Sequence, residues 1–211
     1  MTKFTTHTVE TAPEGSKPIL EMATQKYGYT PNLLANMAEA PAMIEAYVTL
    51  SQIFQKTKLS ETERQVILLT ISRLNECTYC MAAHTTIAQM VKVDIDVIEA
   101  LRTGKPLKDP KLEALRSFAT VVNDTRGYPS EAQIEGFLAA GYTRQTMLEV
   151  IVGISLKVLS NYTNHLAGTE PDEGFKPNTW SPDMSDEEHE AHGQYAIQHY
   201  LSVDFWRGRA A

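Results

Sequence analysis

The chain has 211 residues, 43% of them hydrophobic and 21% charged, which is ordinary for a globular protein with a sizeable core. Its formal net charge of −7, without any basic run, argues against a nucleic-acid partner, because phosphate binding requires a clustered basic surface. The longest apolar stretch, residues 150–159, is broken by Gly153, Ser155 and Lys157, and the N-terminus lacks the apolar region of a signal peptide, so we expect a cytoplasmic protein without a membrane span.

Helical periodicity dominates the chain, and no run of residues alternates as a strand would. In chain order the pattern predicts helices over 17–27, 32–38, 42–55, 61–74, 77–90, 94–102, 111–123, 130–140 and from 143 toward Gly168. Ser60 with Glu63 and Ser130 with Gln133 are typical capping boxes at helix starts. The predicted fold is therefore all-α.

Two of these helices carry apolar residues on nearly every face. Residues 66–71 make the interior of the 61–74 helix apolar all round, which predicts a central, buried helix. The helix after residue 143 is similarly apolar. A body of this size can cover only part of that surface, so we expect a homo-oligomer.

The composition changes after Gly168. Residues 170–182 are rich in proline, and an acidic helix is predicted over residues 183–200. We therefore expect a helical domain over 1–168, followed by a linker and helical arm over 169–211 that packs on the body or on a neighbouring subunit. Three histidines of the arm, His189, His192 and His199, indicate a solvated face rather than a metal site.

The sequence contains only two cysteines, Cys77 and Cys80, three positions apart. A disulfide between them closes almost no loop and adds little stability, so chemistry is the better reason for their spacing. On a helix they lie one turn apart, and His84 lies one further turn along the same face. The positive end of the helix dipole near Cys77, and a histidine able to accept a proton, would both favour a thiolate.

This spacing holds every part of a two-cysteine peroxidase. A thiolate attacks a peroxide oxygen and becomes a sulfenic acid, which the adjacent thiol captures as a disulfide. An external dithiol then reduces that disulfide. Two other interpretations remain: a zinc site formed by Cys77, Cys80, His84 and a distant histidine, or two buried inert thiols. We expect neither a metal nor a cofactor.

The segment from Ser60 to His84, ending in Asn75-Glu-Cys-Thr-Tyr-Cys-Met-Ala-Ala-His84, resembles the signature of the AhpD-like (carboxymuconolactone decarboxylase) superfamily. Similarity to its peroxidase-related branch extends to residues 28–32, 40–41, 139–143 and 161–167, and so spans roughly residues 20 to 175. The resemblance implies an AhpD-like helical bundle that assembles as a homo-oligomer. It further implies an antioxidant oxidoreductase that reduces small hydroperoxides with an external dithiol, such as a thioredoxin-like or lipoyl reductant.

The resemblance also assigns roles to individual residues. It implies that Cys80 is the peroxidatic cysteine, Cys77 the resolving cysteine and His84 a proton relay. AhpD-like proteins usually carry a glutamate twelve positions before the first cysteine, where this chain has Gln65. A glutamine can orient His84 but supplies no counter-charge. Glu149 could replace the missing carboxylate, although a subunit contact is the safer interpretation.

Two other functions compete with the peroxidase. A carboxymuconolactone decarboxylase-type lyase would use general acid and base groups and would not need the cysteine pair. A non-enzymatic redox-sensing oligomer would use the disulfide to change its assembly.

Overall fold

The computed structural model describes residues 4–188, which are helical and contain no strand. The helices are α1 Lys17–Tyr27, α2 Asn32–Met37, α3 Pro41–Gln55, α4 Glu61–Leu74, α5 Thr78–Met90, α6 Ile95–Thr103, α7 Pro110–Asp124, α8 Glu131–Ala139, α9 Arg144–Ala167 and the short 3₁₀ helix η1 Lys176–Asn178. The all-α prediction is confirmed, and the predicted ends of α1 to α8 differ from the observed ones by at most one residue.

The helix starts agree with the predicted capping boxes. At α4 the Glu63 backbone N–H donates to the Ser60 hydroxyl at 3.2 Å, and the Ser60 N–H donates to the Glu63 carboxylate at 2.8 Å. Ser130 and Gln133 repeat this reciprocal arrangement at α8. Each pair satisfies two backbone N–H groups that the first helical turn leaves without partners.

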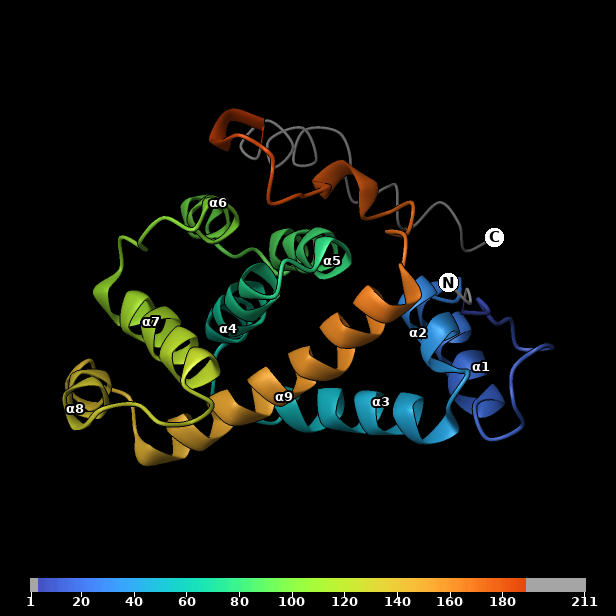
Figure 1. Ribbon diagram of the computed structural model, residues 1–211, viewed down its shortest axis with the longest axis horizontal. Helices are drawn as coiled ribbons and strands as arrows, with labels where there is room; N and C mark the ends of the chain where they lie inside the picture. Colours follow the sequence, from blue (N-terminus) through green and yellow to red (C-terminus); the bar gives the residue numbers. More distant parts are fainter. Residues whose placement is uncertain (1–3, 189–211) are drawn as a thin grey trace.

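Helix α4 lies at the centre of the bundle and packs against α5, α6, α7 and α9 (Figure 1). Its residues 64–72 are all buried, so the prediction of a central helix is confirmed. The long helix α9 crosses the molecule beside α3 and α4 (Figure 1). No helix within residues 4–188 is both long and apolar enough to cross a bilayer.

A glycine permits the close approach of α9 to its neighbours. A Cβ atom added to Gly153 would lie 2.8 Å from Cγ2 of Ile67 in α4 and 3.0 Å from the Phe54 ring in α3. Both neighbours are fully buried and cannot move aside without disturbing the core.

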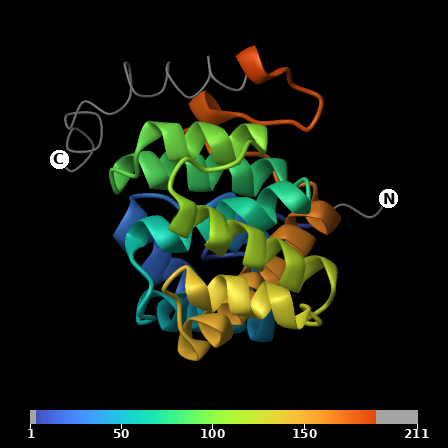
Figure 2. The ribbon, with the colours of Figure 1, turned by 90° about the vertical axis from the view of Figure 1, so that its left-hand side faces the viewer.

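Residues 169–180, here called the strap, return from α9 over α5 and α6 (Figures 1 and 2). The buried Arg102 side chain of α6 donates to the backbone carbonyls of Asn178 at 3.1 Å and Thr179 at 3.0 Å. The Trp180 indole N–H donates in return to the Arg102 carbonyl at 3.0 Å. The three arm histidines, and most of the predicted acidic helix, lie outside the described residues.

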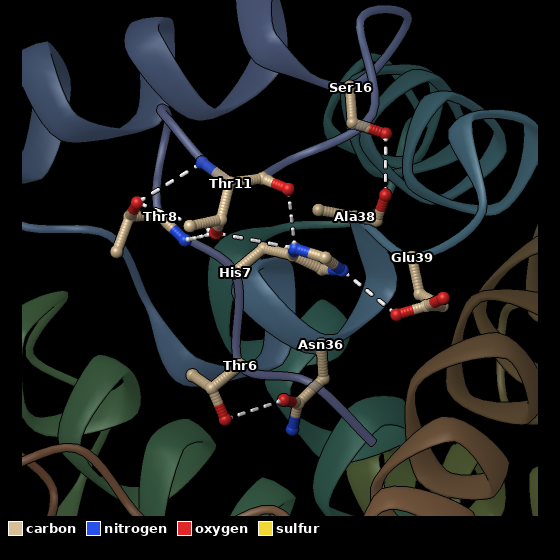
Figure 3. A network of polar contacts seen from close by, with 8 residues as sticks. All are labelled: Thr6, His7, Thr8, Thr11, Ser16, Asn36, Ala38 and Glu39. Atoms are coloured by element: carbon tan, nitrogen blue, oxygen red, sulfur yellow. Dashed lines mark hydrogen bonds and ion pairs between the residues drawn. The ribbon is translucent and has the colours of Figure 1, made fainter.

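The N-terminal segment is tied to the strap through α2. Figure 3 shows His7 bonded to the Glu39 carboxylate at 2.8 Å, and the Thr6 hydroxyl donating to the Asn36 side-chain oxygen at 3.1 Å. The Asn36 amide in turn donates to the Thr169 hydroxyl at 2.8 Å. These bonds hold α2 and the start of the strap in one position.

Gly153→Ala should destabilise the fold, and Gly136→Ala in α8 serves as its matched control, because a Cβ at Gly136 meets nothing within 4 Å. Replacing a helical glycine by alanine gains up to ~1 kcal/mol of helix propensity at either position. At Gly153 the clash costs roughly 1–3 kcal/mol and outweighs that gain. Urea denaturation should show a lower free energy of unfolding for Gly153→Ala and a slightly higher one for Gly136→Ala. A stabilised Gly153→Ala protein would contradict the close packing of α9.

Candidate active site

The link between α4 and α5 fixes the position of the cysteine pair. Helix α4 ends in a Schellman motif: the Glu76 N–H donates to the Arg73 carbonyl at 2.9 Å, and the Cys77 N–H donates to the Ser72 carbonyl at 2.9 Å. Glu76 adopts a left-handed conformation with φ of 52°, which is unusual for a residue other than glycine. Cys77 then caps the N-terminus of α5, and Cys80 lies one turn further along, as the spacing predicts.

The two sulfur atoms are side by side and share one donor. The Asn164 side-chain amide lies 3.2 Å from the Cys80 sulfur and 3.6 Å from the Cys77 sulfur. Both cysteines are free thiols, with 1% of Cys77 and 2% of Cys80 exposed. Apolar side chains of α1, α2 and α3 enclose them, including Leu20 and Met37.

The other wall of the site is a polar face of α9. Four buried residues follow each other at helical spacing on this face: Lys157, Ser160, Asn161 and Asn164. The Asn75 amide, at the end of α4, donates to the Asn161 side-chain oxygen at 2.9 Å. The inner face of α9 is therefore polar where it meets the sulfurs, although the helix is apolar elsewhere.

The residues around Cys80 lower the pKa of its thiol. Burial on its own raises the pKa of a thiol, but the environment of Cys80 outweighs that effect. A hydrogen bond from the Cys77 thiol and the positive charge of Lys157 together hold the pKa of Cys80 well below its usual value. Cys80 is accordingly the more acidic sulfur of the pair.

Cys77 behaves in the opposite way. Its thiol donates the hydrogen bond to Cys80, and this bond, its burial and the negative charge of Cys80 raise the pKa of Cys77 far above the ordinary value. Cys77 is therefore the protonated partner. Cys77, rather than Cys80, stands at the positive end of the α5 dipole, yet Cys77 is the residue whose pKa is raised. The dipole therefore does not decide which sulfur ionises.

His84 is a neutral group in this site. Its Nδ1 lies 3.1 Å from the Gln65 side-chain oxygen, so Nδ1 carries the proton and Nε2 is the acceptor. Burial and the positive charge of Lys157 hold the pKa of His84 well below its usual value. The contact with Gln65 fixes the orientation of the His84 ring, and the imidazole stays uncharged at neutral pH.

Tyr79, between the cysteines, connects the site to the strap. Its hydroxyl donates to the Asp172 carboxylate at 2.6 Å, and the same carboxylate accepts from the Asn32 backbone N–H at 3.0 Å. The Phe175 ring meets the Tyr79 ring edge-on, with centroids 5.9 Å apart. The strap and α2 therefore cover the first turn of α5.

Glu149, considered as a replacement carboxylate, does not meet His84. Its side chain accepts from the Lys58 backbone N–H at 3.1 Å and from the Gln145 amide at 2.8 Å, in the loop before α4 and on its own helix. Among residues 4–188, no three or more histidine, cysteine, aspartate or glutamate side chains gather closely enough to hold a metal ion.

The site residues on α9 were not predicted from the sequence. Lys157 was noted only as an interruption of an apolar stretch. The signal that could have revealed it is the spacing of Lys157, Ser160, Asn161 and Asn164, which forms one polar stripe on an otherwise apolar helix.

Comparisons with known proteins agree on the fold. Residues 39–120 match the carboxymuconolactone decarboxylase family. No curated protein matches the sequence significantly. A solved AhpD-core structure, an uncharacterized peroxidase-related protein from Ralstonia eutropha JMP134, superposes with a TM-score of 0.73 at 21% identity, covering 82% of this chain and 93% of that chain.

Two further solved structures have the same fold. A peroxidase-related protein from Silicibacter sp. TM1040 gives a TM-score of 0.68 at 20% identity and covers 83% of this chain and 97% of that chain. A cysteine-to-alanine variant of the debrominase Bmp8, in complex with 2,3,4-tribromopyrrole, gives 0.68 at 17% identity and covers 83% and 95%. Residues 39–120 therefore match the carboxymuconolactone decarboxylase family, and the chain has the AhpD-like fold that its sequence resemblance implied.

Proposed function

We propose that this protein is a thiol-dependent peroxidase that reduces small hydroperoxides through Cys80 and Cys77. The observation that carries the proposal is the unequal state of the two adjacent sulfurs. They share the Asn164 amide, at 3.2 Å and 3.6 Å, while Cys80 is held as a thiolate and Cys77 as a thiol. A two-cysteine peroxidase requires this division between an attacking and a resolving sulfur.

The cycle begins when the Cys80 thiolate attacks the terminal oxygen of the hydroperoxide. The O–O bond breaks, the alkoxide leaves and takes up a proton as the alcohol, and Cys80 becomes a sulfenic acid. The Cys77 sulfur then attacks the Cys80 sulfur, its proton passes to the leaving hydroxide, and water and the disulfide form. An external dithiol returns two electrons and two protons by thiol–disulfide exchange.

His84 is suited to brief proton transfer rather than to holding a charge. Its Nε2 is available as an acceptor because the proton on Nδ1 is directed to Gln65. The low pKa of its imidazole means that a proton accepted from Cys77 is released again at once to the leaving hydroxide. We therefore assign His84 the relay step and Gln65 the orientation of His84.

Burial of the pair selects for small oxidants. The sulfurs lie beneath α1, α2 and the Tyr79–Asp172 contact, so a compact hydroperoxide reaches Cys80 more easily than a bulky one. A thioredoxin-like or lipoyl dithiol also needs access, so we expect the covering segments to open before the disulfide is reduced. A lyase that works by general acid and base catalysis would not need the two adjacent cysteines.

The two cysteine variants should respond differently to peroxide. Cys77→Ser keeps the attacking thiolate but lacks the resolving thiol, so Cys80 should accumulate as a sulfenic acid that dimedone traps. Cys80→Ser lacks the attacking sulfur and should not react at a comparable rate. Mass spectrometry of the wild type should show the loss of two hydrogens. Stopped-flow measurements with hydrogen peroxide and with cumene hydroperoxide should show the smaller oxidant reacting faster.

Three outcomes would contradict the peroxidase proposal in different ways. Equal labelling of both single variants would remove the division of roles. Two free thiols in the wild type after peroxide treatment would exclude the disulfide cycle. A single oxidation without repeated turnover in the presence of a dithiol would favour the redox-sensing oligomer instead.

We also propose that the protein assembles through the outer face of α9. Opposite the polar face, exposed apolar residues follow each other at helical spacing: Leu148 with 66%, Ile151 with 46%, Tyr162 with 53% and Leu166 with 75% of the side chain exposed. Such a stripe of exposed apolar residues, interrupted at Ser155, is typical of a subunit contact. The aromatic residues of the arm that could add to it lie outside the described part of the chain.

Charging this stripe should weaken assembly. The double variant Ile151→Arg with Leu166→Arg should sediment as a smaller species than the wild type, because two buried charges oppose the contact. Tyr128→Arg is the control, since Tyr128 is 83% exposed on the loop between α7 and α8 and is not a residue of α9. A wild-type monomer at micromolar concentration, or an effect of the control equal to that of the double variant, would refute the proposed contact.

A further inference from the structure

Lys157 is a buried cation in the interior of the bundle. Only 1% of it is exposed, and among residues 4–188 no carboxylate forms an ion pair with it. An ammonium group removed from water without an opposite charge is strongly unfavourable. A charged Lys157 at this position therefore requires an anion beside its side chain.

The titratable groups around Lys157 leave one candidate for that anion. His84 of α5 can only be neutral or positive. Burial, as the main cause, raises the pKa of Tyr47 on α3 far above the ordinary value, so its hydroxyl keeps its proton. Cys77 is the protonated donor of the pair. Cys80 remains: the positive charge of Lys157 acts on it, and Asn164, two turns along the same face of α9, lies 3.2 Å from its sulfur.

We propose that Lys157 is a catalytic residue whose ammonium group, one wall of the site on α9, is the counter-ion that keeps Cys80 ionised. Asn164, two turns further along the same face, donates its side-chain amide to that sulfur. The requirement is mutual: the buried lysine needs the thiolate, and the thiolate needs the lysine.

This role also explains Gln65. The resting site holds one positive charge on Lys157 and one negative charge on Cys80. His84 is neutral, and its hydrogen-bond partner Gln65 is neutral as well. A glutamate at position 65 would either add a second negative charge near the thiolate or draw a proton onto His84, next to Lys157. The amide of Gln65 orients His84 at 3.1 Å without either effect. Lys157 thus supplies the charge that a carboxylate–histidine relay would otherwise supply.

The inference rests on the proposed function only in its choice of Cys80 as the reacting sulfur. The test below measures the ionisation of that sulfur without any peroxide. A protein with an acidic Cys80 that fails to reduce hydroperoxides would refute the peroxidase and leave the role of Lys157 standing.

The experiment is a pH titration of the ultraviolet absorbance of the thiolate in a Cys77→Ser background, where Cys80 is the remaining thiol. The variant that also lacks Cys80 serves as the blank, and circular dichroism checks the fold of each protein. Lys157→Met should raise the pKa of Cys80 by about 1 to 3 pH units, the usual effect of one close opposite charge. Lys157→Arg should restore most of the acidity, and Lys92→Met, at an exposed position, should leave it unchanged.

A second comparison tests the link to Gln65. Adding Gln65→Glu to Lys157→Met should lower the pKa of Cys80 again, because His84 then has a carboxylate partner and no repelling ammonium. An unchanged pKa of Cys80 in Lys157→Met would overturn the proposal, and no recovery in the double variant would overturn the explanation of Gln65. If Lys157→Met does not fold, Lys157→Gln provides the same comparison with a polar neutral side chain.

Discussion

The buried ammonium group of Lys157, next to the sulfurs of Cys77 and Cys80, determines the proposed chemistry of this protein. Lys157 sits on the inner face of α9, which is apolar at Val150 and Leu156 and polar where it meets the sulfurs, from Lys157 to Asn164. Such an arrangement is tolerated only where the buried charge has an opposite partner. The Cys80 sulfur is that partner, and this ties the stability of the α4–α5–α9 core to the reactivity of the site.

The states of the neighbouring groups follow from this pair. The negative sulfur of Cys80 keeps Cys77 protonated, and the positive Lys157 keeps His84 neutral. Gln65, an uncharged residue, matches a neutral imidazole better than a glutamate would. In the proposed mechanism, Lys157, far from the cysteines in sequence, joins the Cys77 thiol in favouring Cys80 as the attacking sulfur.

The fold was predictable because its signals are local. Capping residues, glycines and prolines mark the helix ends, and the all-round apolar interior of α4 marks the central helix. The Cys77, Cys80 and His84 spacing likewise follows from one helix. The role of Lys157 was not predictable in this way, because it depends on which face of α9 meets α5, a tertiary contact that a single helix does not encode. A lysine among valines and leucines therefore appeared as an interruption, although its spacing with Ser160 and Asn164 held the necessary pattern.

The most direct test of the central claim is a side-chain ¹⁵N NMR measurement on the reduced wild-type protein at neutral pH. The Lys157–Cys80 pair predicts a charged Lys157 ammonium and a neutral His84 with its proton on Nδ1, in a protein whose Cys80 is a thiolate. A neutral Lys157 amine would contradict this account, because the buried cation would be missing. An imidazolium at His84 would contradict it equally, because a histidine would then carry the charge assigned to the lysine.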